Sequence, residues 1–152
     1  MFTVSASGDL VSQAISLLDG ERDRIANAAN LSALLYHALE DVNWVGFYFI
    51  RRDELVVGPF QGKPACVRIP LGRGVCGKAA ASGEIIRVDD VNAFDDHIAC
   101  DVDSRSEIVL PLEKSGEIIG VLDIDSPRTG RFGEQDEAVL ARIAKAYIAS
   151  ID

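Results

Sequence analysis

Apolar residues recur at steps of three and four positions in three stretches of the chain. The stretches cover residues 9–18, 22–39 and 135–148, and Leu31 and Leu35 mark the repeating face of the second one. A period near 3.6 residues places such side chains on one side of a helix, the side that packs against a core. The pattern therefore predicts two helices at the start of the chain and a closing helix near its end.

Runs of aromatic and β-branched residues, which favour strands, fill most of the chain between these helices. The predicted strands cover residues 43–50, 54–57, 66–70, 85–88, 107–112 and 117–124. Short polar turns separate the first two strands and the last two, so each of these pairs is expected to form a hairpin. Strands joined by short turns pair antiparallel, which predicts an α+β fold with a central sheet of about six strands and helices packed on it.

Two segments interrupt these patterns. Residues 72–83 pass from glycines to a run of alanines and end in Gly83, which predicts a loop that runs into a short helix. Residues 89–103 are polar and acidic and lack periodicity. Loops of this length are uncommon in compact domains and often functional, and this one carries Cys100.

Composition bounds the size of the fold and the kind of partner. With 152 residues, 48% of them hydrophobic, residues 1–152 are expected to form a single domain around one core. The formal net charge of -9 opposes binding to nucleic acid and to anionic lipid surfaces. The first residues lack the pattern of a signal peptide, and no run approaches the ~20 apolar residues of a membrane span. We expect a cytoplasmic protein with no nucleic-acid or membrane partner.

The three cysteines are the first sign of chemistry. Cys66, Cys76 and Cys100 are odd in number and too few to staple a fold of this size, so they are expected to be thiols in a reducing compartment. A single cysteine is most often a small buried hydrophobic residue. Three within 35 residues, in surroundings rich in Gly, Asp and His, favour a reactive site.

Five segments carry the most distinctive sequence of the chain. They are NWVGFYF at 43–49, GPFQGKPACVRIPLGRGVCGKAAASG at 58–83, HIACD at 97–101, SEIVLPL at 106–112 and GVLDIDSP at 120–127. Together they resemble the free methionine-(R)-sulfoxide reductase family, whose members are single GAF domains. The spacing of the three cysteines is the specific part of this resemblance, because a GAF-like fold alone does not imply an enzyme.

The resemblance implies reduction of free methionine (R)-sulfoxide to methionine, with no cofactor and a role for each cysteine. Cys100 would be the nucleophile that attacks the sulfoxide sulfur, releases methionine and is left as a sulfenic acid. Cys66 would resolve that acid to a disulfide, which thioredoxin would reduce. Cys76 matches a third cysteine of the family, an alternative or relay thiol. The site would also contain three carboxylates, with two aromatic side chains around the substrate methyl group: Glu107, Asp123, Asp125, Trp44 and Tyr48.

The chemistry makes its own demands on these residues. A sulfoxide sulfur is a poor electrophile until its oxygen is protonated or hydrogen-bonded, so its reduction needs a thiolate and an acid. A sulfenic acid beside a second thiol condenses to a disulfide. The two cysteines must then approach to within ~7 Å between Cα atoms. We therefore expect the loop at 89–103 to be mobile enough for Cys100 to meet Cys66.

Two aspartates alternate with aliphatic residues near the end of the last predicted strand. In a strand, Asp123 and Asp125 point to one face while Leu122 and Ile124 point into the core. Solvent exposure would explain this pair, and so would a bound ammonium group between the two carboxylates. A free amino acid carries such an ammonium, whereas a methionine sulfoxide residue inside a protein does not.

The position of Glu107 depends on the register of the last hairpin. A two-residue turn at 115–116 would place Glu107 opposite Ile124, facing away from the aspartates. A three-residue loop or a bulge would instead place it opposite Asp123 or Asp125, on their face. A carboxyl crowded by two others should have a raised pKa, which suits a proton donor.

The aromatic pair has two interpretations. Trp44 and Tyr48 are four positions apart and share a strand face, with Gly46 between them leaving room for a ligand. Core packing and a box around a methyl sulfoxide group fit this spacing equally well.

Local charge favours a different thiol from the one that the resemblance selects. Cys76 lies near the start of a predicted short helix, where the dipole lowers a thiol pKa. Cys100 is surrounded by acidic residues, although His97 or the amides of its loop would offset them. The acidic neighbours are Asp95, Asp96, Asp101 and Asp103.

Other functions fit parts of the sequence. A GAF small-molecule sensor would explain the fold, but such modules are commonly attached to an output domain, for which we expect no residues here. A redox switch would need the cysteines but not an aspartate pair facing a pocket. A zinc site built from Cys66, Cys76, Cys100 and His97 lacks the paired spacing of structural zinc ligands, so we expect no metal. A homodimer through the terminal helices is a further expectation.

Overall fold

A six-stranded antiparallel sheet with helices on both faces forms the body of the structure. The computed structural model describes residues 7–98 and 100–152. The strands are β1 (Trp44–Arg51), β2 (Glu54–Gly62), β3 (Arg68–Pro70), β4 (Ile86–Val88), β5 (Ser106–Lys114) and β6 (Glu117–Ser126). The helices are α1 (Ser7–Leu18), α2 (Arg24–Ala38), α3 (Gly74–Ser82) and α4 (Glu134–Ser150), with a 3₁₀ turn η1 (Val91–Ala93). The sheet order is β3-β2-β1-β6-β5-β4, which confirms the predicted α+β class.

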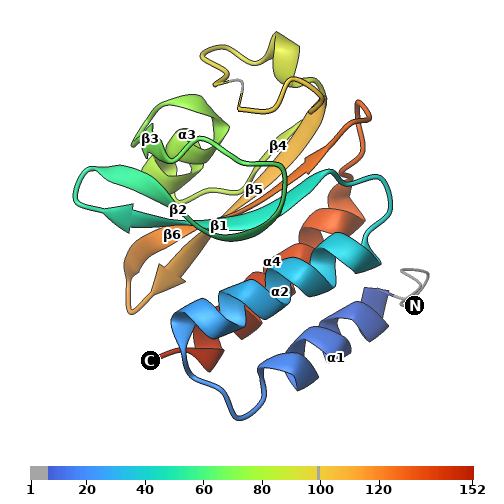
Figure 1. Cartoon of the computed structure of the whole chain (residues 1–152), viewed down its shortest axis with the longest axis vertical. Coiled ribbons are helices and arrows are strands. Elements are labelled where there is room, and N and C mark those ends of the chain that lie inside the picture. The colour runs from blue at the N-terminus through green and yellow to red at the C-terminus, as the bar shows by residue number, and fades with distance from the viewer. Residues whose placement is uncertain (1–6, 99) are drawn as a thin grey trace.

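The two faces of the sheet carry different helices. Helices α2 and α4 cover one face and α1 packs against both, whereas α3 lies over the other face, as does the loop after β4 (Figure 1). The face covered by α2 and α4 holds the larger core, in which Phe47, Leu122 and Tyr147 are fully buried. A smaller cluster that includes Val75 and Val109 lies under α3. The candidate site belongs to this second face.

Polar groups and glycines fix the helix ends. The Asp23 carboxylate accepts from the backbone amides of Ile25 and Ala26 at 3.0 and 2.8 Å, so α2 begins after this N-cap. Helix α3 ends at Ser82 and is capped by Gly83, whose φ of 71° lies in the left-handed region, as the sequence predicted. None of the helices in the described residues is long and apolar enough to cross a membrane. Residues 1–6, where we expect no signal peptide, lie outside the described part.

The hairpin of β5 and β6 combines a two-residue turn with a bulge. Ser115 and Gly116 have φ values of 53° and 83°, as a type I′ turn requires. A few residues beyond the turn Ile119 has no partner on β5, and the register shifts by one position. Glu107 therefore lies opposite Asp125, on the face of the aspartates. Of the two registers considered from the sequence, the bulged one is found.

The strand boundaries differ from the prediction by at most two residues, except at the end of β2, which lies five residues further along the chain. β2 continues beyond residue 57 to Gly62, with a bulge opposite β1, and Pro59 lies beyond the residues that pair with β3. A proline at such a position removes no ladder hydrogen bond. The strand predicted to start at residue 66 starts at Arg68, so its first two residues lie in a loop. The Cys66 carbonyl accepts from the hydroxyl of Tyr48 at 3.1 Å instead of from a neighbouring strand.

Gly120 tests how closely the bulge brings β6 to β1. A Cβ at this position would meet the Phe49 Cα at 3.1 Å and would also strike the Tyr48 carbonyl. We expect Gly120→Ala to reduce the free energy of unfolding by about 2 kcal/mol, because backbone and not a flexible side chain would have to move. Urea unfolding measures this change in the free energy of unfolding. Gly133→Ala is the matched control, since its Cβ would meet only an Asp136 oxygen at 3.9 Å. Equal stability of the two variants would contradict the close approach.

Candidate active site

A cavity of about 50 Å³ opens on the α3 face of the sheet. Seven of the eight side chains selected from the sequence line it: Trp44, Tyr48, Cys76, Cys100, Glu107, Asp123 and Asp125. The eighth, Cys66, is bonded to Cys100 and so lies at its edge. A space of this size admits only a few water molecules, so the cavity is narrow in this disulfide form.

Three carboxyl groups crowd the floor of the cavity. Glu107 and Asp123 are only 8% and 5% exposed, and Asp125 is partly buried. Leu122 and Ile124 alternate with the aspartates and are buried in the opposite core, as the strand pattern predicted. Burial of both aspartates rules out simple solvent exposure as the reason for this pair.

Burial also decides the protonation of these groups. It raises the pKa of Glu107, Asp123 and Asp125 well above their usual ranges, because a charged carboxylate loses its hydration. Repulsion between the neighbouring charges raises each pKa further. The raised pKa expected for Glu107 is therefore found. A carboxyl that keeps its proton near neutral pH is able to donate it to an oxygen atom bound beside it.

One carboxylate oxygen in the cavity lacks a donor. Oδ1 of Asp123 is buried and has no hydrogen-bond partner among the described residues. Unpaired buried acceptors are rare in folded proteins because each one costs free energy. An orphaned acceptor in a cavity wall is typical of a site that receives a cation or a hydrogen-bond donor.

Cys76 lies near the start of α3, as predicted, but its thiol is not activated there. Its Sγ is buried and donates to Oε2 of Glu107 at 3.8 Å. Burial raises the pKa of this thiol, and the charges of Asp123, Glu107 and Asp125 raise it further. The expectation of a depressed pKa is wrong, because burial and three carboxyl groups outweigh the partial charge of one helix end.

Cys100 and Cys66 form a disulfide with Cα atoms 5.4 Å apart. The pair therefore meets the distance that a sulfenic acid and its resolving thiol require. The backbone of Cys66 is anchored to β1, since its carbonyl accepts a hydrogen bond from the Tyr48 hydroxyl. The Cys100 amide donates to the carbonyl of Ile98 at 3.1 Å.

The acidic residues near Cys100 are partly neutralised. Asp96 accepts from the Arg73 guanidinium at 2.8 Å and from the amide of Gly74 at the start of α3. Asp103 accepts from the Lys63 ammonium at 2.9 Å. Hydrogen bonds to these cations lower the pKa of both aspartates, so their charges are paired away from the thiol. The electrostatic argument against Cys100 is therefore weaker than the sequence indicated.

His97 does not supply the positive charge that we expected. It lines the cavity, and its partial burial lowers its pKa because desolvation disfavours the imidazolium. A neutral imidazole offsets no acidic charge, and that expectation is wrong. The amide groups of the loop and the paired aspartates remain as the sources of a less negative environment at Cys100.

The aromatic residues form one wall. The rings of Trp44 and Tyr48 are stacked with centroids 5.8 Å apart, and the ring of Phe60 stacks on that of Trp44 at 5.2 Å. Their polar ends are occupied, since the indole N–H of Trp44 donates to the Lys63 carbonyl at 3.1 Å. A Cβ at Gly46 would meet the indole at 2.6 Å, so this glycine makes room for the ring itself. Trp44 and Tyr48 thus belong to the buried cluster under α3 and also line the cavity.

Sequence reasoning missed several neighbours of the site. Asn43 donates from Nδ2 to Asp101 at 3.4 Å and to Ser104 at 3.3 Å, which ties the loop of Cys100 to the start of β1. Ile98 packs on Gly74, where a Cβ would meet its side chain at 3.1 Å. No periodic pattern marks these residues, because their contacts join segments distant in the sequence.

The four-ligand zinc set considered from the sequence is not assembled. Two of its sulfur atoms, those of Cys66 and Cys100, are bonded to each other, so they are not free to bind a metal.

Comparison with known proteins identifies close relatives. A model of the GAF domain matches residues 13–151. The free methionine-R-sulfoxide reductase of Escherichia coli (strain K12) is 58% identical over 128 residues, which cover 84% of this chain and 78% of that protein. Two solved structures are similar with TM-scores of 0.94. One is fRMsr of Staphylococcus aureus in its reduced form, at 49% identity over 96% of this chain and 95% of that one. The other is free methionine-R-sulfoxide reductase from Neisseria meningitidis in complex with its substrate, at 46% identity over 99% and 93%.

Asp123→Asn should stabilise the oxidised protein at neutral pH by on the order of 1 kcal/mol. Because the pKa of this carboxyl is raised in the folded state, the folded protein binds more protons than the unfolded chain above pH ~4, and stability falls as pH rises through that window. Asparagine does not titrate, so the variant avoids this loss of stability. The stability that it gains over the wild type should therefore vanish at pH ~4. Urea unfolding at several pH values measures it.

Asp103→Asn is the control for this experiment. The pKa of Asp103 is lowered by its bond to Lys63, so any stability it contributes is present at neutral pH and lost as pH falls. The control should therefore show no gain at neutral pH. A neutral-pH gain in the control as large as that of Asp123→Asn would contradict the assignment to the buried cluster.

Proposed function

This chain belongs to the free methionine-R-sulfoxide reductases, a family of GAF domains, and we propose that it is an oxidoreductase that reduces free methionine (R)-sulfoxide to methionine. The observation that carries the proposal is the placement of a cysteine pair, a wall of aromatic rings and three buried carboxyl groups around one cavity. Sulfoxide reduction needs a thiol and an acid, and the aromatic wall adds an apolar surface for the methyl group.

The carboxyl groups support a free amino acid as the substrate. Asp123 has an unpaired buried oxygen, and Asp125 lies two residues further along the same face of β6. An α-ammonium group would supply the missing donors and compensate the charge. A methionine sulfoxide residue within a polypeptide has an amide at that position and lacks this charge. Trp44 and Tyr48 would face the methyl group of the sulfoxide.

In the first step the Cys100 thiolate attacks the sulfoxide sulfur while a protonated carboxyl, which we assign to Glu107, donates to the sulfoxide oxygen. The attack forms a bond between the Cys100 sulfur and the substrate sulfur. The sulfur–oxygen bond of the substrate then breaks, the oxygen passes with the donated proton to the Cys100 sulfur, and the bond between the two sulfur atoms breaks, which leaves Cys100 as a sulfenic acid. Methionine leaves with its sulfur reduced by two electrons, and the Cys100 sulfur is oxidised by two.

In the second step the Cys66 thiolate attacks the sulfenic sulfur. A disulfide forms, and the oxygen leaves as water after taking up a proton. The short distance between the two Cα atoms and the anchoring of Cys66 by Tyr48 support this pairing. Cys76, buried against Glu107, is the third thiol, and we assign it the role of an alternative or relay.

A dithiol reductant must then return the disulfide to two thiols, and we propose thioredoxin. Val67 and Val102, close to the two cysteines in sequence, are 58% and 81% exposed. Exposed apolar side chains beside a disulfide suit the docking of a reducing partner. A cycle that depends on such a reductant belongs in a reducing compartment, so we propose a cytoplasmic location and one GAF unit over residues 1–152. A homodimer remains part of the proposal.

Cysteine variants test the mechanism. Cys100→Ser should reduce turnover to below about one thousandth of wild type, because the attacking sulfur is gone. Cys66→Ser should release about one methionine per chain in a first turnover and then continue at least about 10-fold more slowly than wild type, because only the buried thiol of Cys76 is left to resolve the sulfenic acid. The first turnover is measured by the release of methionine. Steady turnover is measured by the oxidation of NADPH coupled through thioredoxin. Full turnover by Cys100→Ser would move the nucleophile to Cys76.

A panel of substrates tests the specificity. Free L-methionine (R)-sulfoxide should be reduced at least about 100-fold faster than its N-acetyl derivative or a peptide with an internal methionine sulfoxide, since both lack the ammonium. Rates of NADPH oxidation with each compound, and with the free (S) epimer, are the readout. Equal rates on the free and acylated forms would contradict the role of the aspartates. No oxidation with any of them would favour a sensor, the alternative function.

A further inference from the structure

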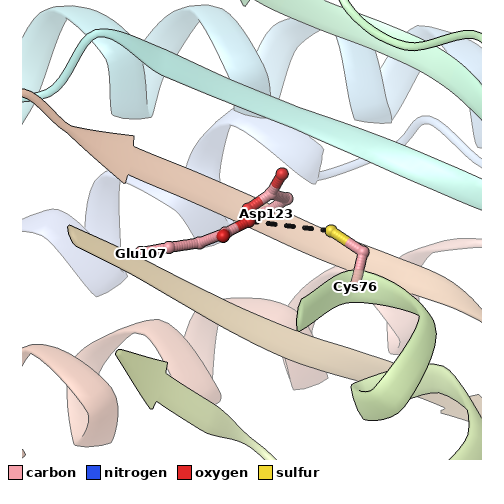
Figure 2. Close-up of side chains that lie close together, drawn as sticks. All are labelled: Cys76, Glu107 and Asp123. Carbon is pink, nitrogen blue, oxygen red and sulfur yellow. Dashed lines mark hydrogen bonds between the residues drawn. The ribbon is translucent and has the colours of Figure 1, made fainter. Parts of the chain in front are cut away.

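Three side chains from different elements converge beneath the cavity. Cys76 comes from α3, Glu107 from β5 and Asp123 from β6, and one potential ligand atom of each lies within 4.8 Å of the others (Figure 2). All three residues are buried. We call this set the thiol–carboxylate triad.

A second observation indicates that this triad has room for a ligand. Asp123 is 5% exposed, and its Oδ1 lacks any hydrogen-bond partner among the described residues. The same side chain lines the cavity, so an ion that enters the cavity would lie beside Asp123. Three acidic groups side by side also repel one another once ionised, and a bound cation would remove that repulsion.

We propose that the triad is a binding site for a thiophilic divalent cation of the Zn²⁺ type. A thiolate with two carboxylates is a donor set for zinc and not for Mg²⁺ or Ca²⁺, which prefer oxygen ligands alone. In tetrahedral zinc, bonds of about 2.3 Å to sulfur and about 2.0 Å to oxygen separate the ligand atoms by roughly 3.5 Å. The observed 3.8 Å between Cys76 Sγ and Glu107 Oε2 is close to this value.

The site would be open and independent of the redox state of the other cysteines. Three protein ligands leave a fourth position, which faces the cavity. With Cys66 and Cys100 in a disulfide, Cys76 is still a free thiol, so the oxidised protein keeps all three ligands. A cation here would occupy Glu107 and Asp123 and exclude a substrate ammonium. Inhibition by the cation therefore rests on the proposed function, whereas binding itself does not.

Metal binding to the oxidised, full-length protein tests the proposal without turnover. Zn²⁺, titrated in competition with a chromophoric chelator, should bind one ion per chain, and Co²⁺ should give the near-ultraviolet absorption of a thiolate–cobalt bond. Cys76→Ala should lose that absorption and weaken zinc binding by at least about 10-fold, and so should Asp123→Asn. Mg²⁺ in excess should displace neither ion.

Matched controls keep each outcome decisive. Asp103→Asn, an exposed carboxylate paired with Lys63, should bind zinc like the wild type. Glu107→Gln replaces Asp123→Asn if the latter fails to fold, as judged by its thermal unfolding. No binding, cobalt binding without a sulfur absorption, or equal binding by Cys76→Ala would overturn the site. Zinc that binds as expected but leaves reductase activity intact would retain the site and overturn only the inhibition.

Discussion

The constraint on which the site depends is the burial of three carboxyl groups on neighbouring strands. Glu107 lies opposite Asp125 across the hairpin, and Asp123 is two residues away on the same face. Like groups placed so closely, out of water, cost stability unless they keep protons or meet a cation. The fold tolerates this arrangement because the other face of the same strands is filled by fully buried aliphatic side chains. The free energy gained by burying the aliphatic side chains offsets the free energy lost by crowding the carboxyl groups. Functional sites are often stabilised by the surrounding core in this way.

That arrangement also determines which thiol is suited to which task. Cys76 is in direct contact with the carboxyl cluster, so burial and charge raise its pKa and make it a poor nucleophile. Cys100 lies on the loop above, where Asp96 and Asp103 are paired with cations. The same cavity therefore holds a less reactive thiol against the acids and a disulfide-forming pair of cysteines. This division agrees with a reaction in which acid and nucleophile act from opposite sides of a bound sulfoxide.

The loop of Cys100 is joined to the body of the fold by hydrogen bonds, ion pairs, apolar packing and the disulfide. Asn43, at the start of β1, donates to Asp101 and Ser104, and Arg73 and Asp96 join the loop to the start of α3. Lys63 also pairs with Asp103, Ile98 packs on Gly74, and the disulfide joins the loop to Cys66. Reduction of that bond would leave hydrogen bonds and ion pairs to hold the loop, and exposed ion pairs contribute little. Movement of the loop after reduction would agree with the narrow cavity found in the disulfide form.

The sequence by itself determined the strands, the helices, the face shared by the two aspartates and the face shared by Trp44 and Tyr48, because these follow from periods of 2 and 3.6 residues along one chain segment. It also indicated the cysteines through the resemblance to a known family. Only the tertiary structure decided the rest. The bulge at Ile119, which brings Glu107 to the aspartates, depends on how two strands pair and has no local signal. The raised pKa of Cys76 and the neutralisation of Asp96 and Asp103 come from partners distant in the sequence, since burial and charge are properties of packed neighbours and not of spacing.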